Sequence, residues 1–311
     1  MIISVSRRTD IPRFYFDWFL NRLKVGFVLV RNPMNPAQVS RIALNKDVLD
    51  FIVFWSKNPE PMLPFLDKLK PYPYYIQFTI NPYDTDIEAH LPSKEHLLDT
   101  FKKLADKIGA DRMVWRYSPV LLNAKYTPDF HMQAFENLAQ SLKGYTRRCH
   151  LSFLDMYAKI EYNMKALGVL EATLKQQKTM AAAFKKAAGA ANMSIGACGN
   201  VDLAQTKLAP AVCIDGALIE KLTGLHLNLK KDKNQRDTCF CTSSIDIGTY
   251  NTCLNGCAYC YANHSVKSIR KKVAGYDPMA PMLCDTVKPT DKIIERVVCS
   301  NFIRQKNLFE E

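Results

Sequence analysis

The sequence lacks long apolar segments, a secretory leader and low-complexity linkers. No run of about 18 apolar residues occurs in the 311 residues, so a transmembrane helix and a membrane partner are not expected. The first residues, MIISVSRRTDIP, show no basic stretch followed by an apolar one, so a secretory signal is not expected either. These absences predict a cytoplasmic protein, in which clustered cysteines indicate metal or redox chemistry rather than disulfides.

Acidic residues are the minority charge, with 30 Asp and Glu against 42 Lys and Arg, and the formal net charge is +12. A basic surface favours anionic partners, either a phosphorylated small molecule or nucleic acid. The basic residues are spread along the chain, and their densest run, Lys267–Lys272, is short. The composition therefore favours an ordinary basic surface and a small-molecule or anionic substrate, with nucleic acid as the less favoured partner.

Strand-like apolar runs alternate with helical patterns along most of the chain. With 48% hydrophobic residues, the chain has enough apolar material for a large core. Alternation of strands and helices favours an α/β fold with a parallel sheet, and eight strand candidates predict a TIM-like β/α barrel over residues 1–250. Residues 251–311 are expected to form a cluster loop and a C-terminal extension packed on the barrel. The strand candidates are Ile2–Val5, Phe27–Val30, Phe51–Trp55, Tyr74–Ile80, Met113–Trp115, Leu151–Leu154, Met193–Ile195 and Ile245–Ile247.

Helical periodicity is found between the strand candidates and near the C-terminus. Ser93 is placed to cap the second of these helices, with Glu95 in its first turn. The predicted helices are Arg13–Lys24, Glu95–Lys107, Asp129–Lys143, Leu170–Ala191 and Asp291–Phe302.

Polar residues follow nearly every strand candidate. In a β/α barrel the C-terminal strand ends converge on one face, which is the usual active site. A lysine at that rim can bind an anionic substrate or act as an acid–base group, so Lys57 is a catalytic candidate together with Arg116 and Asp155. We predict that eight of these polar side chains line one cavity: Arg7, Arg8, Asp10, Lys57, Gln77, Asn81, Arg116 and Asp155.

Half of the ten cysteines lie between positions 239 and 260. Cys253, Cys257 and Cys260 have the spacing C-x3-C-x2-C, which lets one loop supply three thiolates to a single metal centre. Three thiolates on a [4Fe-4S] cluster leave one iron open to a small molecule. The same three with Cys239 or Cys241 would also complete a closed zinc site, so the spacing alone leaves iron–sulfur and zinc both open.

The segment CLNGCAYCYA, Cys253–Ala262, resembles the cluster loop of the radical S-adenosylmethionine (SAM) enzymes. Tyr259 stands where that family has an aromatic residue before the last cysteine, and the following Tyr-Ala pair resembles the spore photoproduct lyase branch. The resemblance implies that Cys253, Cys257 and Cys260 hold a [4Fe-4S] cluster. It also implies that SAM binds the open iron and is split reductively, with a reductant such as ferredoxin or flavodoxin.

The whole chain also resembles an uncharacterised bacterial family, domain of unknown function 1848. This resemblance implies an iron–sulfur centre but no known reaction. The matching stretches are SRRTDIP, FWSKNP, QFTIN, WRYSP and the cysteine block that begins at Cys239.

The order of the segments departs from that of typical radical SAM enzymes, in which the cluster loop follows the first barrel strand. Here it follows the last strand candidate, which in a closed barrel lies beside the first, so the order is that of a circularly permuted barrel. A GGE-like SAM motif is not recognisable. Arginines and an aspartate can bind a carboxylate and a ribose, and the cofactor-binding candidates are Arg7, Arg8, Asp10, Gln77 and Asn81.

Cys239 and Cys241 have three interpretations. In the first, either Cys239 or Cys241 is a fourth ligand of the same cluster, which would exclude SAM. In the second, both belong to an auxiliary metal site with Cys198 or Cys213. In the third, neither binds metal. The leading functional hypothesis is a radical SAM-like iron–sulfur enzyme acting on an unknown substrate. The alternatives are an iron–sulfur electron-transfer or redox protein without SAM, a nucleic-acid repair or modification enzyme, and a zinc-stabilised binding module.

Overall fold

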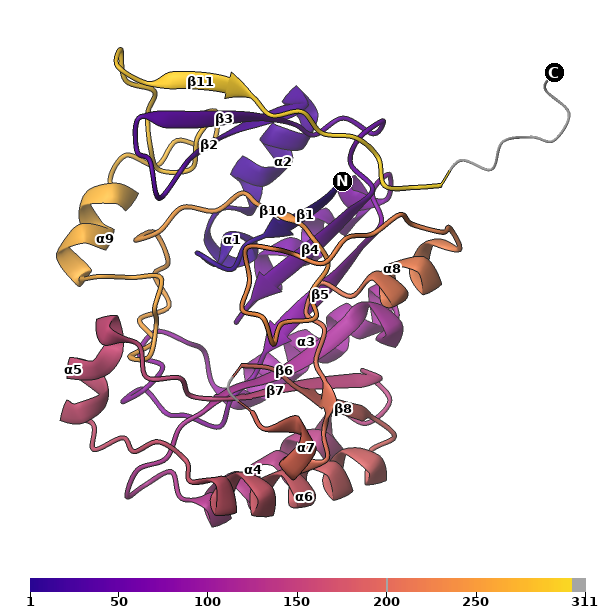
Figure 1. Cartoon of the computed structure of the whole chain (residues 1–311), viewed down its shortest axis with the longest axis vertical. Coiled ribbons are helices and arrows are strands. Elements are labelled where there is room, and N and C mark those ends of the chain that lie inside the picture. Colours follow the sequence, from indigo (N-terminus) through magenta and orange to yellow (C-terminus); the bar gives the residue numbers. More distant parts are fainter. Residues whose placement is uncertain (200, 304–311) are drawn as a thin grey trace, which may run out of the picture.

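Eight parallel strands form the main sheet of the computed structural model, which describes residues 1–199 and 201–303 (Figure 1). Their order is β10-β1-β4-β5-β6-β7-β8-β9. Strands β1 and β4 are almost continuously apolar, which is typical of strands covered on both faces. The strands are β1 (Ile2–Val5), β4 (Phe51–Ser56), β5 (Tyr74–Thr79), β6 (Met113–Val120), β7 (Arg148–Phe153), β8 (Ser194–Ala197), β9 (Ala209–Pro210) and β10 (Ile245–Asp246).

The α/β class and the parallel sheet are confirmed. The last strand lies beside the first, because β10 pairs with β1 through Ile3–Ile245 and Ser4–Asp246. The loop that follows β10 therefore starts next to the carboxyl end of β1. Within the described residues β9 and β10 are the two ends of the sheet and no ladder joins them, so closure into a barrel stays a prediction.

Helices cover one face of the sheet, and the chain between β9 and β10 covers part of the other. Most of the helices bury the larger core, which includes Trp18, Phe54 and Phe101. A second core joins Ile2, Phe51 and Tyr75 of the sheet to side chains from residues 213–241. The helices are α1 (Ile11–Phe14), α2 (Phe16–Val25), α3 (Lys94–Ile108), α4 (Pro128–Ser141), α5 (Ala158–Ala166), α6 (Leu174–Ala190), α7 (Leu203–Thr206), α8 (Gly216–Thr223) and α9 (Val266–Val273), with 3₁₀ segments η1 (Glu60–Leu69) and η2 (Ala110–Arg112).

Helix starts follow local capping chemistry. The Ser93 side chain accepts a hydrogen bond from the amide of His96, as predicted for α3. Thr173 and Gln176 form a reciprocal capping box at the start of α6. All helices in the described residues are too short or too polar to span a bilayer.

Two elements differ from the sequence predictions. The Phe27–Val30 candidate becomes β2 (Phe27–Arg31), which lies outside the main sheet because it forms an antiparallel hairpin with β3 (Gln38–Ala43). The predicted helix Asp291–Phe302 is wrong. It contains β11 (Lys292–Glu295), which pairs with β3, since paired isoleucines favour a strand.

The C-terminal extension packs on the N-terminal part of the chain. The amino group of Met1 donates to the carbonyl of Cys299 at 2.8 Å. The carboxylate of Asp50 accepts from the amide of Asn301 at 2.7 Å. Residues 304–311 of the predicted extension lie outside the described residues.

Candidate functional site

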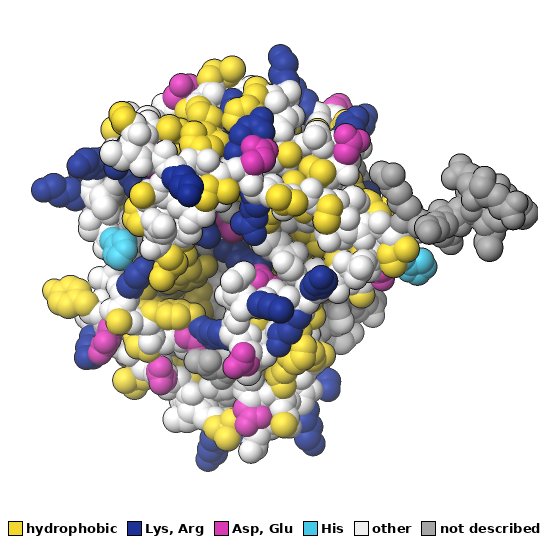
Figure 2. Space-filling model, turned by 45° about the horizontal axis from the view of Figure 1, so that its top comes forward, with side chains coloured by type: hydrophobic (Ala, Val, Ile, Leu, Met, Phe, Trp, Pro, Cys, Tyr) yellow, Lys and Arg dark blue, Asp and Glu magenta, His cyan; other side chains and the backbone are white. Residues whose placement is uncertain are grey.

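A cavity of about 410 Å³ opens at the carboxyl ends of the strands. Its wall includes residues that follow β1, β4, β7 and β8, residues of the carboxyl half of β6, and the cysteine loop after β10. The space-filling view shows a hollow with Lys and Arg side chains in it and around it (Figure 2). The volume lies within the range of small-molecule pockets, roughly 300–1,000 Å³.

Most of the predicted site residues meet at this cavity. Six strand-end side chains and five cysteines are among its lining residues: Arg7, Arg8, Asp10, Lys57, Arg116, Asp155, Cys239, Cys241, Cys253, Cys257 and Cys260. Gln77 and Asn81 are exceptions, because both are completely or almost completely buried and lie behind the wall. Gln77 donates to the carbonyl of Cys213 at 2.8 Å, and Asn81 donates to the hydroxyl of Tyr259 at 3.1 Å.

The cysteine loop packs against the segment that follows β5. Cys257 forms an isolated antiparallel bridge with Glu88, and the amide of Ala258 donates to the carbonyl of Ile87 at 2.9 Å. Gly256 has a φ of +68°, and a Cβ there would lie 2.9 Å from Nδ1 of His90. A glycine is thus required both by the left-handed backbone and by the close approach of the two segments.

The start of the loop is fixed to the end of β1. The carboxylate of Asp246 accepts hydrogen bonds from the hydroxyls of Ser4 and Ser6, at 2.9 and 2.6 Å, and from the amide of Arg7 at 2.7 Å. Gly248 passes so close to Ser6 that a Cβ would lie 2.0 Å from its Oγ. These contacts hold the loop beside the two arginines that follow β1.

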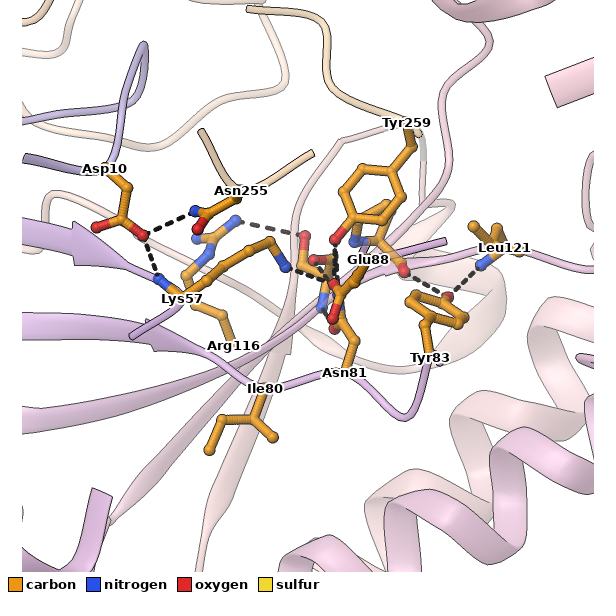
Figure 3. Close-up of polar contacts among 12 residues, drawn as sticks. Asp10, Lys57, Ile80, Asn81, Tyr83, Glu88, Arg116, Leu121, Asn255 and Tyr259 are labelled. Carbon is orange, nitrogen blue, oxygen red and sulfur yellow. Dashed lines mark hydrogen bonds and ion pairs between the residues drawn. The ribbon is translucent and has the colours of Figure 1, made fainter. Parts of the chain in front are cut away.

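Lys57 and Glu88 form a buried ion pair beneath the loop (Figure 3). Nζ of Lys57 lies 2.6 Å from Oε1 of Glu88, which also accepts from the hydroxyl of Tyr259. Burial alone would lower the pKa of Lys57, but Glu88, Cys257 and Asp10 together outweigh it and the pKa is raised. Burial would raise the pKa of Glu88, but Lys57 and Lys94 lower it. Lys57 is therefore held as a cation at the cavity wall.

Asp10 links three parts of the site. Its carboxylate accepts from the amide of Lys57 at 2.8 Å, from Nδ2 of Asn255 at 2.9 Å and from the amide of Arg13 at 3.1 Å. Burial raises the pKa of Asp10 despite these hydrogen bonds. Asp10 thus connects the start of α1, the end of β4 and the cysteine loop.

Arg7 and Arg116 both lie against Trp55, with guanidinium carbons 5.4 and 5.0 Å from its ring centre. Nε1 of Trp55 and Nε of Arg7 are buried and have no hydrogen-bond partner within the described residues. Asp155 accepts from Nη1 of Arg236 at 2.6 Å. The cavity therefore combines cationic side chains with donors that a polar ligand could satisfy.

The three loop thiols are the residues that could hold a metal cluster, in number and in chemistry. All ten cysteines are free and lie in the described residues. Burial raises the pKa of Cys253 and Cys260, and it raises the pKa of Cys257 to about 12. Metal binding would deprotonate these thiols, and Lys57 lies near enough to Cys257 to offset the negative charge. Within residues 1–199 and 201–303, no three His, Cys, Asp or Glu side chains are yet arranged to hold an ion directly.

Sequence reasoning missed several residues that build the site. Glu88, Asp246 and Asn255 supply the contacts that position the loop, and Arg236 pairs with Asp155. Glu88 lies nine positions beyond the end of β5 in a segment with other acidic residues, so nothing in the sequence singles it out. Asp246 could have been found, since it is a carboxylate at the end of the strand that precedes the cysteine motif.

Comparison with protein-family models matches residues 2–262 to the domain of unknown function DUF1848. No curated protein matches the chain. Among solved structures, a variant of the carboxyl transferase domain of Rhizobium etli pyruvate carboxylase with pyruvate is similar at 16% identity and a TM-score of 0.30. The match covers 72% of this chain and 30% of that chain, so this chain spans less than a third of that protein. A similarity this low indicates nothing about the site.

Proposed function

This chain belongs to the DUF1848 family, and for it we propose a radical SAM-like function in which Cys253, Cys257 and Cys260 hold a [4Fe-4S] cluster. The proposal includes a TIM-like, circularly permuted barrel, with the cluster loop after its last strand. The observation that carries it is the position of the three thiols. They lie on the wall of one cavity with Arg7 and Arg8, in a chain where β10, the last strand of the main sheet, pairs with β1, the first.

The cluster, when bound, would supply one electron that splits a carbon–sulfur bond of SAM, and a ferredoxin or flavodoxin would replace that electron. The chain's own residues bind and orient. Arg7 and Arg8, which line the cavity, would bind the carboxylate of the methionine moiety, because arginine matches carboxylates with paired donors. Nε of Arg7, buried and without a partner in the described residues, is one such donor.

Lys57 and Arg116 give the substrate side of the cavity its positive charge. Lys57 is neutralised only in part, since Glu88 also faces Lys94 at 3.2 Å. Arg116 donates to Sγ of Cys213 at 3.0 Å and lies on Trp55. A small anionic substrate is therefore favoured over a neutral one, and Asp155 with Arg236 would contact its outer end.

The test uses full-length protein purified without oxygen. We expect iron and sulfide near four of each per chain at the loop cysteines, a number set by the cluster type. With a strong reductant and SAM, the protein should release 5′-deoxyadenosine. Cys253→Ala, Cys257→Ala and Cys260→Ala should each abolish the loop cluster and this product, whereas Cys299→Ala, at an exposed position, should change neither. Protein with an intact cluster that releases no 5′-deoxyadenosine would favour electron transfer instead.

A further inference from the structure

Four other cysteines, here called the core cysteines, meet on another part of the cavity wall. Cys198 follows β8, Cys213 precedes α8, and Cys239 and Cys241 precede β10. Cys213 and Cys241 are buried in the second core, and Cys198 and Cys239 pack against the same core. Cys213 is central, because it affects the pKa of both Cys198 and Cys241. Sγ of Cys239 accepts from the amide of Cys241 at 3.4 Å. Four soft ligands from three separate segments are thus gathered in one place.

The surroundings of the core cysteines hold Cys213 firmly. Its carbonyl accepts from the hydroxyl of Tyr75 at 2.6 Å and from Nε2 of Gln77 at 2.8 Å. Its Sγ accepts from Arg116, and the ring of His150 also contacts it. The same thiols border the second apolar core, where Cys213 and Cys241 are buried. Charged sulfur ligands in such surroundings need a compensating cation.

We propose that Cys198, Cys213, Cys239 and Cys241 bind a single zinc ion, separate from the cluster of the loop cysteines. Four thiolates around one ion are a common structural zinc site. A Zn–S bond of 2.3 Å places tetrahedral sulfurs roughly 3.8 Å apart. Four thiols that pack on one core match that spacing better than the spacing of an iron–sulfur cube, which separates its ligands by the width of the cluster.

Binding requires side chains to move. No three of the described side chains surround an ion, so more than one of the four thiols has to rotate, and Cys239 has to turn away from the amide of Cys241. Zinc with four thiolates has a net charge of −2. Arg116 at Cys213, and Arg236, whose pKa is affected by Cys198, would offset this charge.

The position of the core cysteines indicates what the ion does. In the described residues β9 and β10 are the two edge strands of the main sheet, and no backbone hydrogen bonds of the ladder join them. The core cysteines lie in the segments on the two sides of that gap: those after β8 and β9, and that before β10. The zinc ion would join the two ends of the sheet and fix Arg116 at the substrate side of the cavity.

The experiment uses the full-length chain with Cys253→Ala, Cys257→Ala and Cys260→Ala combined, so it does not depend on the proposed cluster or on activity. Metal content is measured after anaerobic purification and dialysis. We expect one zinc per chain in this variant, and its loss when Cys213→Ser or Cys241→Ser is added. Adding Cys299→Ala instead should leave the zinc content unchanged.

A second measurement covers the case in which the added variants do not fold. Cobalt replaces zinc in the folded triple variant, and the absorption of a tetrahedral cobalt–thiolate centre is expected. Absence of zinc and of that cobalt spectrum would overturn the proposal. Iron with sulfide at these four cysteines would also overturn it. A disulfide among them in the metal-free protein, detected as a lower number of free thiols, would overturn it as well. Failure of SAM cleavage in the unaltered chain would overturn the proposed function and leave this inference standing.

Discussion

The loop cysteines, Cys253, Cys257 and Cys260, and the core cysteines differ in how the chain brings them together. The loop cysteines lie within eight consecutive residues, and the surrounding contacts only set the position and orientation of the loop. The core cysteines are spread over 198–241 and become neighbours only because residues 213–241 fold back against the sheet. A centre built from one loop can therefore be read from its spacing, whereas a centre built from the fold cannot.

The variant with the largest expected effect on the difference between the two cysteine groups is Glu88→Ala. It leaves the buried Lys57 ammonium without its partner beneath the loop, which should reduce the free energy of unfolding by about 3–5 kcal/mol. The loop should lose iron, while the core cysteines, which do not contact Glu88, should keep their metal. Urea unfolding and metal analysis measure both effects.

The control for Glu88→Ala is Asp99→Ala, which removes an exposed ion pair with Lys103. Exposed pairs contribute little, so this variant should unfold almost as the unaltered chain does. Equal effects of the two variants would contradict the claim that Glu88 anchors the loop.

A smaller effect is expected for Gly256→Ala. The left-handed backbone at Gly256 disfavours any side chain by roughly 1–2 kcal/mol, and the new Cβ would meet the ring of His90. Iron bound by the loop should fall, and zinc bound by the core cysteines should not. Gly275→Ala is the matched control, because its Cβ would lie 3.7 Å from the nearest atom, the carbonyl oxygen of Lys272. Full iron content in Gly256→Ala would show that the loop is less constrained than its contacts indicate.

The sequence predicts the parts of the fold and site that depend on local pattern. Strand–helix alternation predicted the parallel sheet, and Ser93 predicted the start of α3. Polar strand ends predicted six of the side chains that line the cavity. Gln77 was misplaced because the segment around Cys213 covers it. It lies on the same face of β5 as Thr79, which lines the cavity, but two residues deeper, where its side chain donates to the carbonyl of Cys213.

Other parts depend on contacts between distant segments and leave no local signal. β2 has the composition of a sheet strand, and only its pairing with β3 removes it from the main sheet. β9 is two residues long and contains Pro210, which argues against a strand, although it lies in the apolar run 208–214. Glu88 becomes part of the site only through its bridge to Cys257.

The smallest expected effect belongs to Tyr261→Phe. The hydroxyl of Tyr261 donates to the carbonyl of Arg7 at 2.9 Å, and its loss should reduce the free energy of unfolding by about 0.5–1.5 kcal/mol. Iron and zinc contents should both stay unchanged, because the backbone contacts of the loop remain. Tyr162→Phe, at a side chain that is 85% exposed, is the control and should have no measurable effect. A loss of loop iron in Tyr261→Phe would mean that this single contact sets the loop's position.

The most direct test of the central claim is electron paramagnetic resonance of the reduced protein with and without SAM, in the unaltered chain and in Cys239→Ala. If three thiolates hold the loop cluster, the cluster signal should be present in both proteins, and SAM should change its shape in both. Loss of the signal in Cys239→Ala would instead indicate a fourth thiolate ligand. A signal that SAM leaves unchanged would contradict the radical SAM-like function and favour electron transfer.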